Sequence, residues 1–335
     1  MIENDKNVAV IKPYHFGLAL SGGGARGFAH VGALKVLDEM GVRPDIISGT
    51  SAGSLIGVLY ADGYTPDEII DLFSSLNFSD LAEITIPRSG FFKITRFRNF
   101  LKKVLRARYL EDLEIPVMVT ATDLDQGCSK TFATGPVIDI VCASCSIPVL
   151  FSPVIIDNVH YVDGGVLRNF PVTPIRPFCD IVMGVNVNPM VAKEYKKSII
   201  GIAERSYGFI FKSNTLADMK LCDILIQTKE IIDYNIFDIE NLREIAACGY
   251  RDTQEVISLD KENLKEILPI FIEHQTPYMI FTTNGFYSTL KPEVVRDRFA
   301  YRGKVRFGNK MEDFLPGGPM SDSPACQIQQ FDSID

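Results

Sequence analysis

The chain has 335 residues, of which 46% are hydrophobic and 23% charged, and its formal net charge is −8. This composition is typical of a globular protein and excludes a largely disordered chain, while the acidic balance does not favour nucleic acid as a partner. The length allows one large α/β domain with an appendage, or two modest domains.

The sequence contains no obvious export or membrane-spanning segment. Met1–Asn7 is polar and lacks the basic and apolar regions of a secretory signal, so export by that route is not expected. Apolar runs such as Ser54–Ala61 fall short of the ~18 residues that span a bilayer, so any membrane contact is expected to be peripheral.

Seven scattered cysteines, an odd number, favour small buried side chains in a reducing compartment over a disulfide framework. We therefore expect a cytoplasmic location, which allows peripheral contact with a membrane surface. The oligomeric state is left open. Cys142 and Cys145 have C-x-x-C spacing, but no second such pair exists and no histidine is close by. We interpret them as core residues and expect no metal site.

Strands and helices alternate along the chain. Strands are predicted at 16–20, 45–48, 116–122, 159–162, 181–187, 223–228 and 278–283. Helices are predicted at 29–40, 52–62, from 65 onward, at 137–144, within 198–219, at 239–248 (closed by Gly249) and at 260–274. This alternation predicts an α/β fold with a mainly parallel sheet covered on both faces.

The first of two glycine turns, Gly22–Gly27, has the form G-x-G-x-x-G between a predicted strand and a predicted helix. This is the context of a dinucleotide-binding turn, and Asp45 lies near the usual distance for a ribose-binding acid. Backbone N–H groups at a helix N-terminus, however, bind any negative oxygen. The ligand could be a phosphate or a tetrahedral oxyanion.

The second turn has the form G-x-S-x-G, with Ser51 between Gly49 and Gly53, and it also joins a strand to a helix. A nucleophile elbow has this construction, because small flanking residues let the chain turn sharply and expose the serine hydroxyl. Alternatively, Ser51 is only a helix cap. Two such turns at consecutive strand ends favour an oxyanion over a nucleotide.

A serine nucleophile needs a base. The four histidines are His15, His30, His160 and His274, and the order serine, acid, histidine of an ordinary α/β-hydrolase would leave His274 as the main candidate. Asp163 instead directly follows a predicted strand. We favour Asp163 as the base, since Gly164 and Gly165 leave its carboxylate unobstructed.

With these motifs in order, the sequence resembles the patatin-like phospholipase family. Gly22–Gly27 is similar to the family's oxyanion loop, Gly49–Gly53 to its nucleophile elbow and Asp163–Gly165 to its catalytic-aspartate motif. Further landmarks match at 143–148, 151–153 and 169–171. The resemblance is strong over 14–187 and looser to about 250.

The resemblance implies a three-layer α/β/α sandwich over 14–258. The C-terminal extension at 259–316 has no counterpart in the family, and the glycine, proline and serine residues at the start of 317–335 predict a mobile tail. The resemblance also implies an acyl hydrolase that acts on phospholipids, lysophospholipids or neutral acyl esters and needs no metal or organic cofactor. In this interpretation Asp163 accepts the proton of Ser51. The oxyanion site is drawn from Gly22, Gly23, Gly24, Ala25, Arg26 and Gly27, chiefly the N–H groups around Gly23, Gly24 and Ala25.

Several interpretations stay open at this point. Arg26 could brace the glycine loop or meet a lipid phosphate. The protein could be a catalytically idle lipid-binding scaffold, or a nucleotide-binding protein that uses Gly22–Gly27. Asp123 and Asp125 could bind a cation, but the Gln126-Gly127 that follows them favours a hairpin turn.

The segment Phe91–Tyr109 interleaves aromatic and aliphatic residues with lysines and arginines in an otherwise acidic chain. One interpretation is an amphipathic helix that packs on the domain with a solvated cationic face. The functional alternative is a peripheral membrane contact near the entrance of the active site.

Overall fold

The structure of the chain is a computed structural model. It describes residues 12–74, 83–84, 92–188, 195, 197, 199–228, 230–236, 238, 240–259, 278–281 and 287–290. The helix predicted at 260–274 and the tail at 317–335 lie outside the described residues, as does most of the predicted C-terminal extension.

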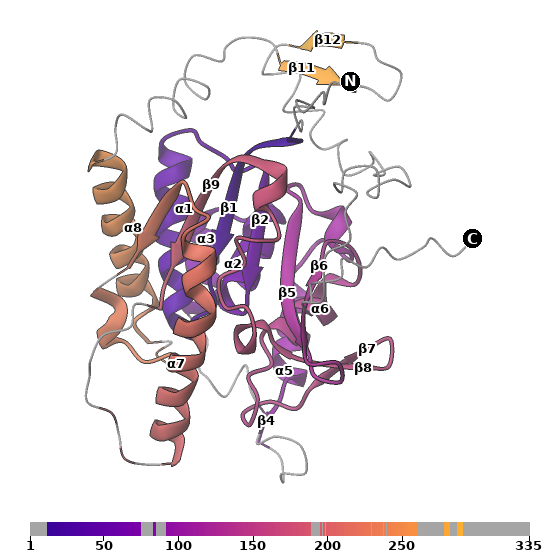
Figure 1. Cartoon of the computed structure of the whole chain (residues 1–335), viewed down its shortest axis with the longest axis vertical. Helices are drawn as coiled ribbons and strands as arrows, with labels where there is room; N and C mark the ends of the chain where they lie inside the picture. The colour runs from indigo at the N-terminus through magenta and orange to yellow at the C-terminus, as the bar shows by residue number, and fades with distance from the viewer. Residues whose placement is uncertain are drawn as a thin grey trace, which may run out of the picture.

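An eight-stranded sheet forms the centre of the fold (Figure 1). Its order is β10-β9-β1-β2-β5-β8-β7, with β6 paired to β5. The strands are β1 (Tyr14–Leu20), β2 (Ile46–Thr50), β5 (Val117–Asp123), β6 (Cys128–Phe132), β7 (Val154–Ile156), β8 (Val159–Asp163), β9 (Cys179–Asn186) and β10 (Ile224–Gln227). From β10 to β5 neighbouring strands are parallel, whereas the pairs β5–β8, β7–β8 and β5–β6 are antiparallel.

Helices complete the layers. They are α1 (Ala29–Glu39), α2 (Ala52–Ala61), α3 (Pro66–Ser74), α5 (Thr95–Val104), α6 (Val137–Ser144), α7 (Ile199–Met219) and α8 (Leu242–Leu259). Short 3₁₀ helices are η1 (Gly24–Phe28), η2 (Leu110–Asp112), η3 (Gly164–Val166), η4 (Arg176–Phe178) and η5 (Glu230–Asp233).

Alternation along the strands divides the core between the two faces of the sheet. In β1, Leu18 and Leu20 enter a large cluster beneath α1, α2 and α6, while Ala19 enters a smaller cluster with Phe170 and Met219. Successive side chains on a strand point to opposite faces, so a central strand such as β1 contributes to both clusters. The predicted α/β/α sandwich is therefore present.

Helix α8 packs closely on α1, and both are drawn side by side in Figure 1. A methyl group placed at Gly249 would overlap the backbone of Ala29, and one placed at Gly32 would overlap the backbone of Ala246. The prediction that Gly249 ends this helix was wrong: α8 runs on to Leu259, because the glycine permits close helix packing and is not a cap.

The antiparallel end of the sheet was only partly predicted. β8 lies where a strand was expected, but β6 and β7 were not predicted. The turn between β5 and β6 is the hairpin turn expected at this place: Asp123 Oδ1 accepts the N–H groups of Asp125 and Gln126 at 3.0 and 2.8 Å, and Gly127 has a φ of +67°. β11 (Tyr278–Phe281) lies within the predicted strand 278–283 and pairs with β12 (Tyr287–Leu290).

Candidate active site

Ser51 lies between the end of β2 and the start of α2 in a strained backbone conformation. Its φ is 52° and its ψ is −123°, a region that residues with a side chain rarely adopt. A methyl group at Gly53 would overlap the carbonyl oxygen of Leu20, and one at Gly49 would lie 2.6 Å from the Gly53 backbone. The two glycines are thus required for a turn this sharp, which is the geometry of a nucleophile elbow.

Asp163 ends β8 and faces Ser51 directly. The Ser51 hydroxyl donates a hydrogen bond of 2.6 Å to Asp163 Oδ2, and the N–H of Gly165 donates one of 2.7 Å to Oδ1. A methyl group at Gly164 would overlap the carbonyl oxygen of Thr120, so the chain after Asp163 also runs close to β5. Both oxygens of the carboxylate are therefore held in place.

The Asp163 carboxylate is only 2% exposed. Burial raises its pKa from the ordinary 3.8 to about 6, because the charged form loses its hydration, while the hydrogen bonds from Ser51 and Gly165 act in the opposite direction. A carboxylate with this pKa is ionised near neutral pH yet basic enough to take a proton from a serine during a reaction.

Ser144, at the end of α6, supports the serine from the other side. Its hydroxyl accepts the backbone N–H of Ser51 at 2.8 Å and donates to the carbonyl oxygen of Thr120 at 2.7 Å. The hydroxyl thereby ties the strained elbow to β5. Sequence reasoning had placed Ser144 in a family landmark but had given it no role.

The glycine loop lies beside the elbow, and two of its N–H groups already have acceptors. Gly22 donates to the carbonyl oxygen of Asn169 at 2.9 Å, and Ala25 donates to that of Ile236 at 2.7 Å. In the described part of the chain, Gly23 and Gly24 have no such acceptor. Of the three N–H groups expected to hold an oxyanion, that of Ala25 is thus already bonded within the protein.

Arg26 braces this loop. Its guanidinium donates to the carbonyl oxygens of Tyr234 at 2.8 Å and Ile232 at 3.4 Å, which come from the segment before α8. Gly27 lies where a methyl group would overlap the side chain of Ala52 at the start of α2. Of the two roles considered for Arg26, these contacts support the structural one.

The described histidines lie away from the hydroxyl of Ser51, which donates to Asp163. His30 is buried, its Nε2 lies 2.7 Å from the carbonyl oxygen of Ser21, and burial lowers its pKa to about 4. The Nδ1 atoms of His15 and His160 lie 3.3 and 3.1 Å from carboxylate oxygens of Asp180 and Asp125 near the surface. His274 is outside the described residues.

The Asp45 carboxylate, considered above as a ribose-binding acid of a dinucleotide site, binds backbone N–H groups of the protein. Its Oδ2 accepts the N–H groups of His15 and Phe16, at 3.0 and 2.9 Å. The carboxylate therefore fixes the start of β1.

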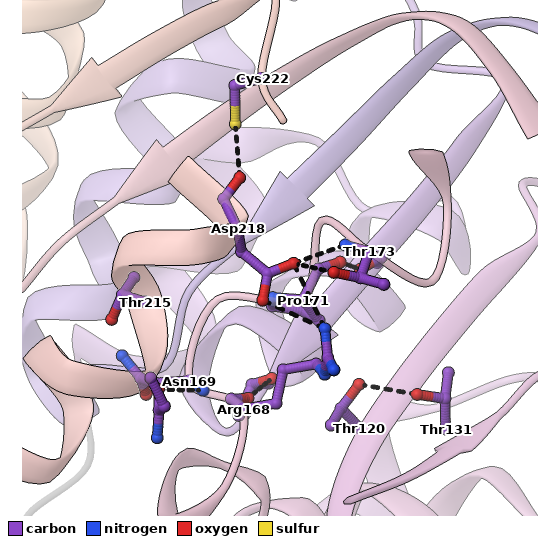
Figure 2. Close-up of polar contacts among 12 residues, drawn as sticks. Thr120, Thr131, Arg168, Asn169, Pro171, Thr173, Thr215, Asp218 and Cys222 are labelled. Atoms are coloured by element: carbon purple, nitrogen blue, oxygen red, sulfur yellow. Dashed lines mark hydrogen bonds and ion pairs between the residues drawn. The ribbon is translucent and has the colours of Figure 1, made fainter. Parts of the chain in front are cut away.

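Helix α7 supplies contacts that sequence reasoning missed (Figure 2). Asp218 binds Arg168 at 3.1 Å and accepts the backbone N–H of Thr173 at 2.6 Å, and its carboxylate is drawn between these two residues. Asn214 accepts the N–H of Asn169 at 3.0 Å and donates to the carbonyl oxygen of Gly165 at 2.8 Å. The chain that follows Asp163 is thus held from α7.

The side chain of Asn169 is 1% exposed and lies between the glycine loop and the aspartate loop. Its Oδ1 is the atom that a methyl group at Gly22 or Gly165 would approach. Neither Oδ1 nor Nδ2 has a hydrogen-bond partner within the described residues.

Within the segment Phe91–Tyr109, helix α5 turns its apolar side chains toward the domain. Phe97 and Leu101 are buried, and Phe100 stacks edge-on against Phe73 with ring centroids 5.0 Å apart. Lys102 and Lys103 are exposed. These contacts fit an amphipathic helix packed on the domain, while the last residue of the segment, Tyr109, is 49% exposed.

Cys142 is buried in the core, and burial raises its pKa to about 12. Within the described ranges, no three histidine, cysteine or acidic side chains are grouped as a metal would need. Over the same ranges, no helix has both the length and the apolar character needed to cross a bilayer.

Fold and site together define an α/β protein with a strained serine at a strand–helix elbow and a buried aspartate as its partner. Residues 18–175 match the family described as patatin-like phospholipase. This match spans just under half of the chain, which therefore carries a domain similar to this family.

Two curated relatives illustrate the match. The chain is 36% identical over 172 residues to a patatin-like phospholipase domain-containing protein of Caenorhabditis elegans, and 31% identical over 181 residues to Lysophospholipase NTE1 of Kluyveromyces lactis. The matches cover 48% and 51% of this chain and only 12% of each relative.

Among solved structures, VipD from Legionella pneumophila has a similar fold. The TM-score is 0.51 at 16% sequence identity, and the match covers 74% of this chain and 67% of VipD.

Proposed function

We propose that the chain is a lipid acyl hydrolase that cleaves acyl esters through an acyl-enzyme on Ser51, with Asp163 as its base. The observation that carries the proposal is the 2.6 Å hydrogen bond from the strained Ser51 to the buried Asp163 carboxylate. The family match supports a lipid ester as the substrate class, in the range of phospholipase, lysophospholipase and carboxylesterase reactions.

In the first half of the reaction, Asp163 Oδ2 takes the hydroxyl proton as Ser51 Oγ forms a bond to the ester carbonyl carbon. The carbonyl oxygen becomes an oxyanion. When the tetrahedral intermediate collapses, the bond to the leaving alcohol breaks and Asp163 returns the proton to that alcohol. The acyl group stays on Ser51.

Water completes the cycle. Asp163, ionised again, takes a proton from a water molecule that attacks the acyl-enzyme, and the released Ser51 oxygen recovers a proton from Asp163. One ester and one water thus give one acid and one alcohol. No imidazole is needed, because the raised pKa of Asp163 suits it for both proton transfers.

We assign the oxyanion to the N–H groups of Gly23 and Gly24, next to the elbow. Removal of one such donor in comparable sites costs roughly 3 to 4 kcal/mol of transition-state stabilisation. Gly22, Ala25, Arg26 and Gly27 hold the loop in shape, since their described contacts are to the protein itself.

The test is hydrolysis of a panel of phospholipids, lysophospholipids and neutral acyl esters by the wild type, Ser51→Ala and a matched control, Ser258→Ala. Ser258 is an exposed serine on α8. We expect activity on at least one lipid ester from the wild type and the control, and nearly none from Ser51→Ala. If all three proteins bind lipid without hydrolysing any of the esters, the chain is an idle scaffold and the proposal fails.

A further inference from the structure

Helix α7 has an inner face that reaches the candidate active site. The ring of Phe211 lies against Gly165, two residues after Asp163: a methyl group at this glycine would come within 2.8 Å of the ring. Asn214 continues the same face with its hydrogen bond to the carbonyl oxygen of Gly165. Asp218 follows with the hydrogen bond that it accepts from Thr173 (Figure 2). The position of α7 is thus fixed by the chain that carries the base.

The outer face of α7 carries large apolar side chains. Ile202, Phe209 and Leu216 are 51, 55 and 50% exposed. Each follows the previous one by seven residues, which is about 20° short of two full helical turns. The three side chains therefore lie on one side of the helix and form a stripe about 21 Å long. We call Ile202, Phe209 and Leu216 the α7 stripe.

Basic side chains border this stripe. Arg205 and Lys212 follow Ile202 and Phe209 by three residues each, which places both on the same flank. The guanidinium of Arg205 lies 4.9 Å from the ring centroid of Phe209, and Lys212 is exposed. Asp218, an acidic residue of this helix, is buried and paired with Arg168. The two described border residues, Arg205 and Lys212, are thus both basic in a chain with a net charge of −8.

We propose that the α7 stripe and its basic border form the surface by which the protein docks on a lipid bilayer containing anionic lipids. An apolar stripe flanked by lysine or arginine matches such an interface, because apolar side chains enter the acyl boundary while the cations meet anionic headgroups. The inference rests on the proposed function, since a hydrolase of membrane lipids has to reach its substrate there.

The two faces of α7 place the proposed membrane-docking surface close to the candidate active site. The inner face holds the loop of Asp163 and the outer face meets the bilayer, so docking brings the candidate active site to the membrane surface. The α5 segment is less suited to this task, because its apolar residues Phe97 and Leu101 are buried.

The experiment measures binding without catalysis, so that its failure can be told apart from failure of the proposed function. All proteins carry Ser51→Ala, and co-sedimentation is measured with vesicles of phosphatidylcholine alone or mixed with phosphatidylserine. One variant adds Phe209→Gln and Leu216→Gln, and a second adds Arg205→Gln and Lys212→Gln. The matched control adds Leu124→Gln and Ile155→Gln, which replace side chains that are 54 and 59% exposed away from α7.

We expect the stripe variant to lose about tenfold or more in partitioning to mixed vesicles. The basic variant should lose several-fold at low salt and match its parent at high salt, and the control should bind like its parent. Circular dichroism and urea unfolding verify that each variant is folded. Equal binding by the stripe variant and its parent, or an equal loss in the control, would overturn the proposal. So would a dimer in light scattering that the stripe variant abolishes without a change in vesicle binding, which would assign the stripe to a second copy of the chain.

Discussion

Replacing Asp163 with asparagine should abolish turnover and at the same time stabilise the fold at neutral pH. Asparagine has the size of aspartate, its amide oxygen can still accept the N–H of Gly165, and its NH₂ group can donate to the Ser51 oxygen. What the variant loses is the negative charge. That charge is the base in our account, and it is also a buried carboxylate that the fold has to keep ionised.

The size of the effect follows from the pKa of Asp163, which burial raises from 3.8 to about 6. Between these values the folded protein binds more protons than the unfolded chain, so the free energy of unfolding falls as the pH rises. The loss is about 3 kcal/mol at pH 8 and roughly half of that at pH 5, since one pKa unit corresponds to about 1.4 kcal/mol. The free energy of unfolding of Asp163→Asn should not show this decrease, because asparagine does not ionise.

Urea unfolding of both proteins at several pH values between 5 and 8 provides the assay. We expect the variant to be more stable at pH 8, with an advantage that shrinks toward pH 5. His30, whose pKa is lowered to about 4, titrates in both proteins and cancels in the difference. A difference that does not change with pH, or a variant less stable than the wild type at pH 8, would refute the reasoning. In parallel, kcat/KM of the wild type for a soluble ester should rise with pH through about 6 and then level off.

Other substitutions probe the rest of the site. Ser144→Ala removes the acceptor of the Ser51 N–H and should lower kcat on the order of tenfold with little change in KM; an equal change in both constants would point to a general loss of structure. Gly24→Val places a β-branched residue at a φ of +57° against the Ile236 backbone, so turnover and the thermal midpoint should both fall, and unchanged kinetics in a folded variant would remove the loop from the mechanism. His160→Gln and His274→Gln should keep turnover within about threefold of the wild type; a loss near 10⁴-fold in either folded variant would restore a triad.

The parallel half of the fold could be predicted from the sequence because each element there carries its own local signal. β1 and β2 are apolar runs that end in glycine turns, and α2 lies within the predicted helix at 52–62. The antiparallel end gives weaker signals: β7 has only three residues, and its middle side chain, Ile155, is exposed. A short strand of this kind has too few residues to show a periodicity.

In the candidate site, too, some residues could be predicted from local sequence signals and others could not. Ser51 and Asp163 could be named because the glycines around them have a spacing that local geometry requires. Asn214 and Asp218 could not be named, since they act on the loop of Asp163 from a helix about 50 residues further along the chain. The hydrogen bond from Ala25 to Ile236 was missed for the same reason, and its acceptor is a backbone carbonyl that no side-chain pattern reveals.

Covalent labelling of Ser51 tests the central claim most directly. The wild type, Ser51→Ala and Asp163→Asn are treated with a fluorophosphonate, and the modified residue is located by peptide mass spectrometry. Our account predicts one adduct on Ser51 in the wild type, much slower formation of the same adduct in Asp163→Asn and none in Ser51→Ala. An adduct on another residue, or equal labelling of all three proteins, would contradict it.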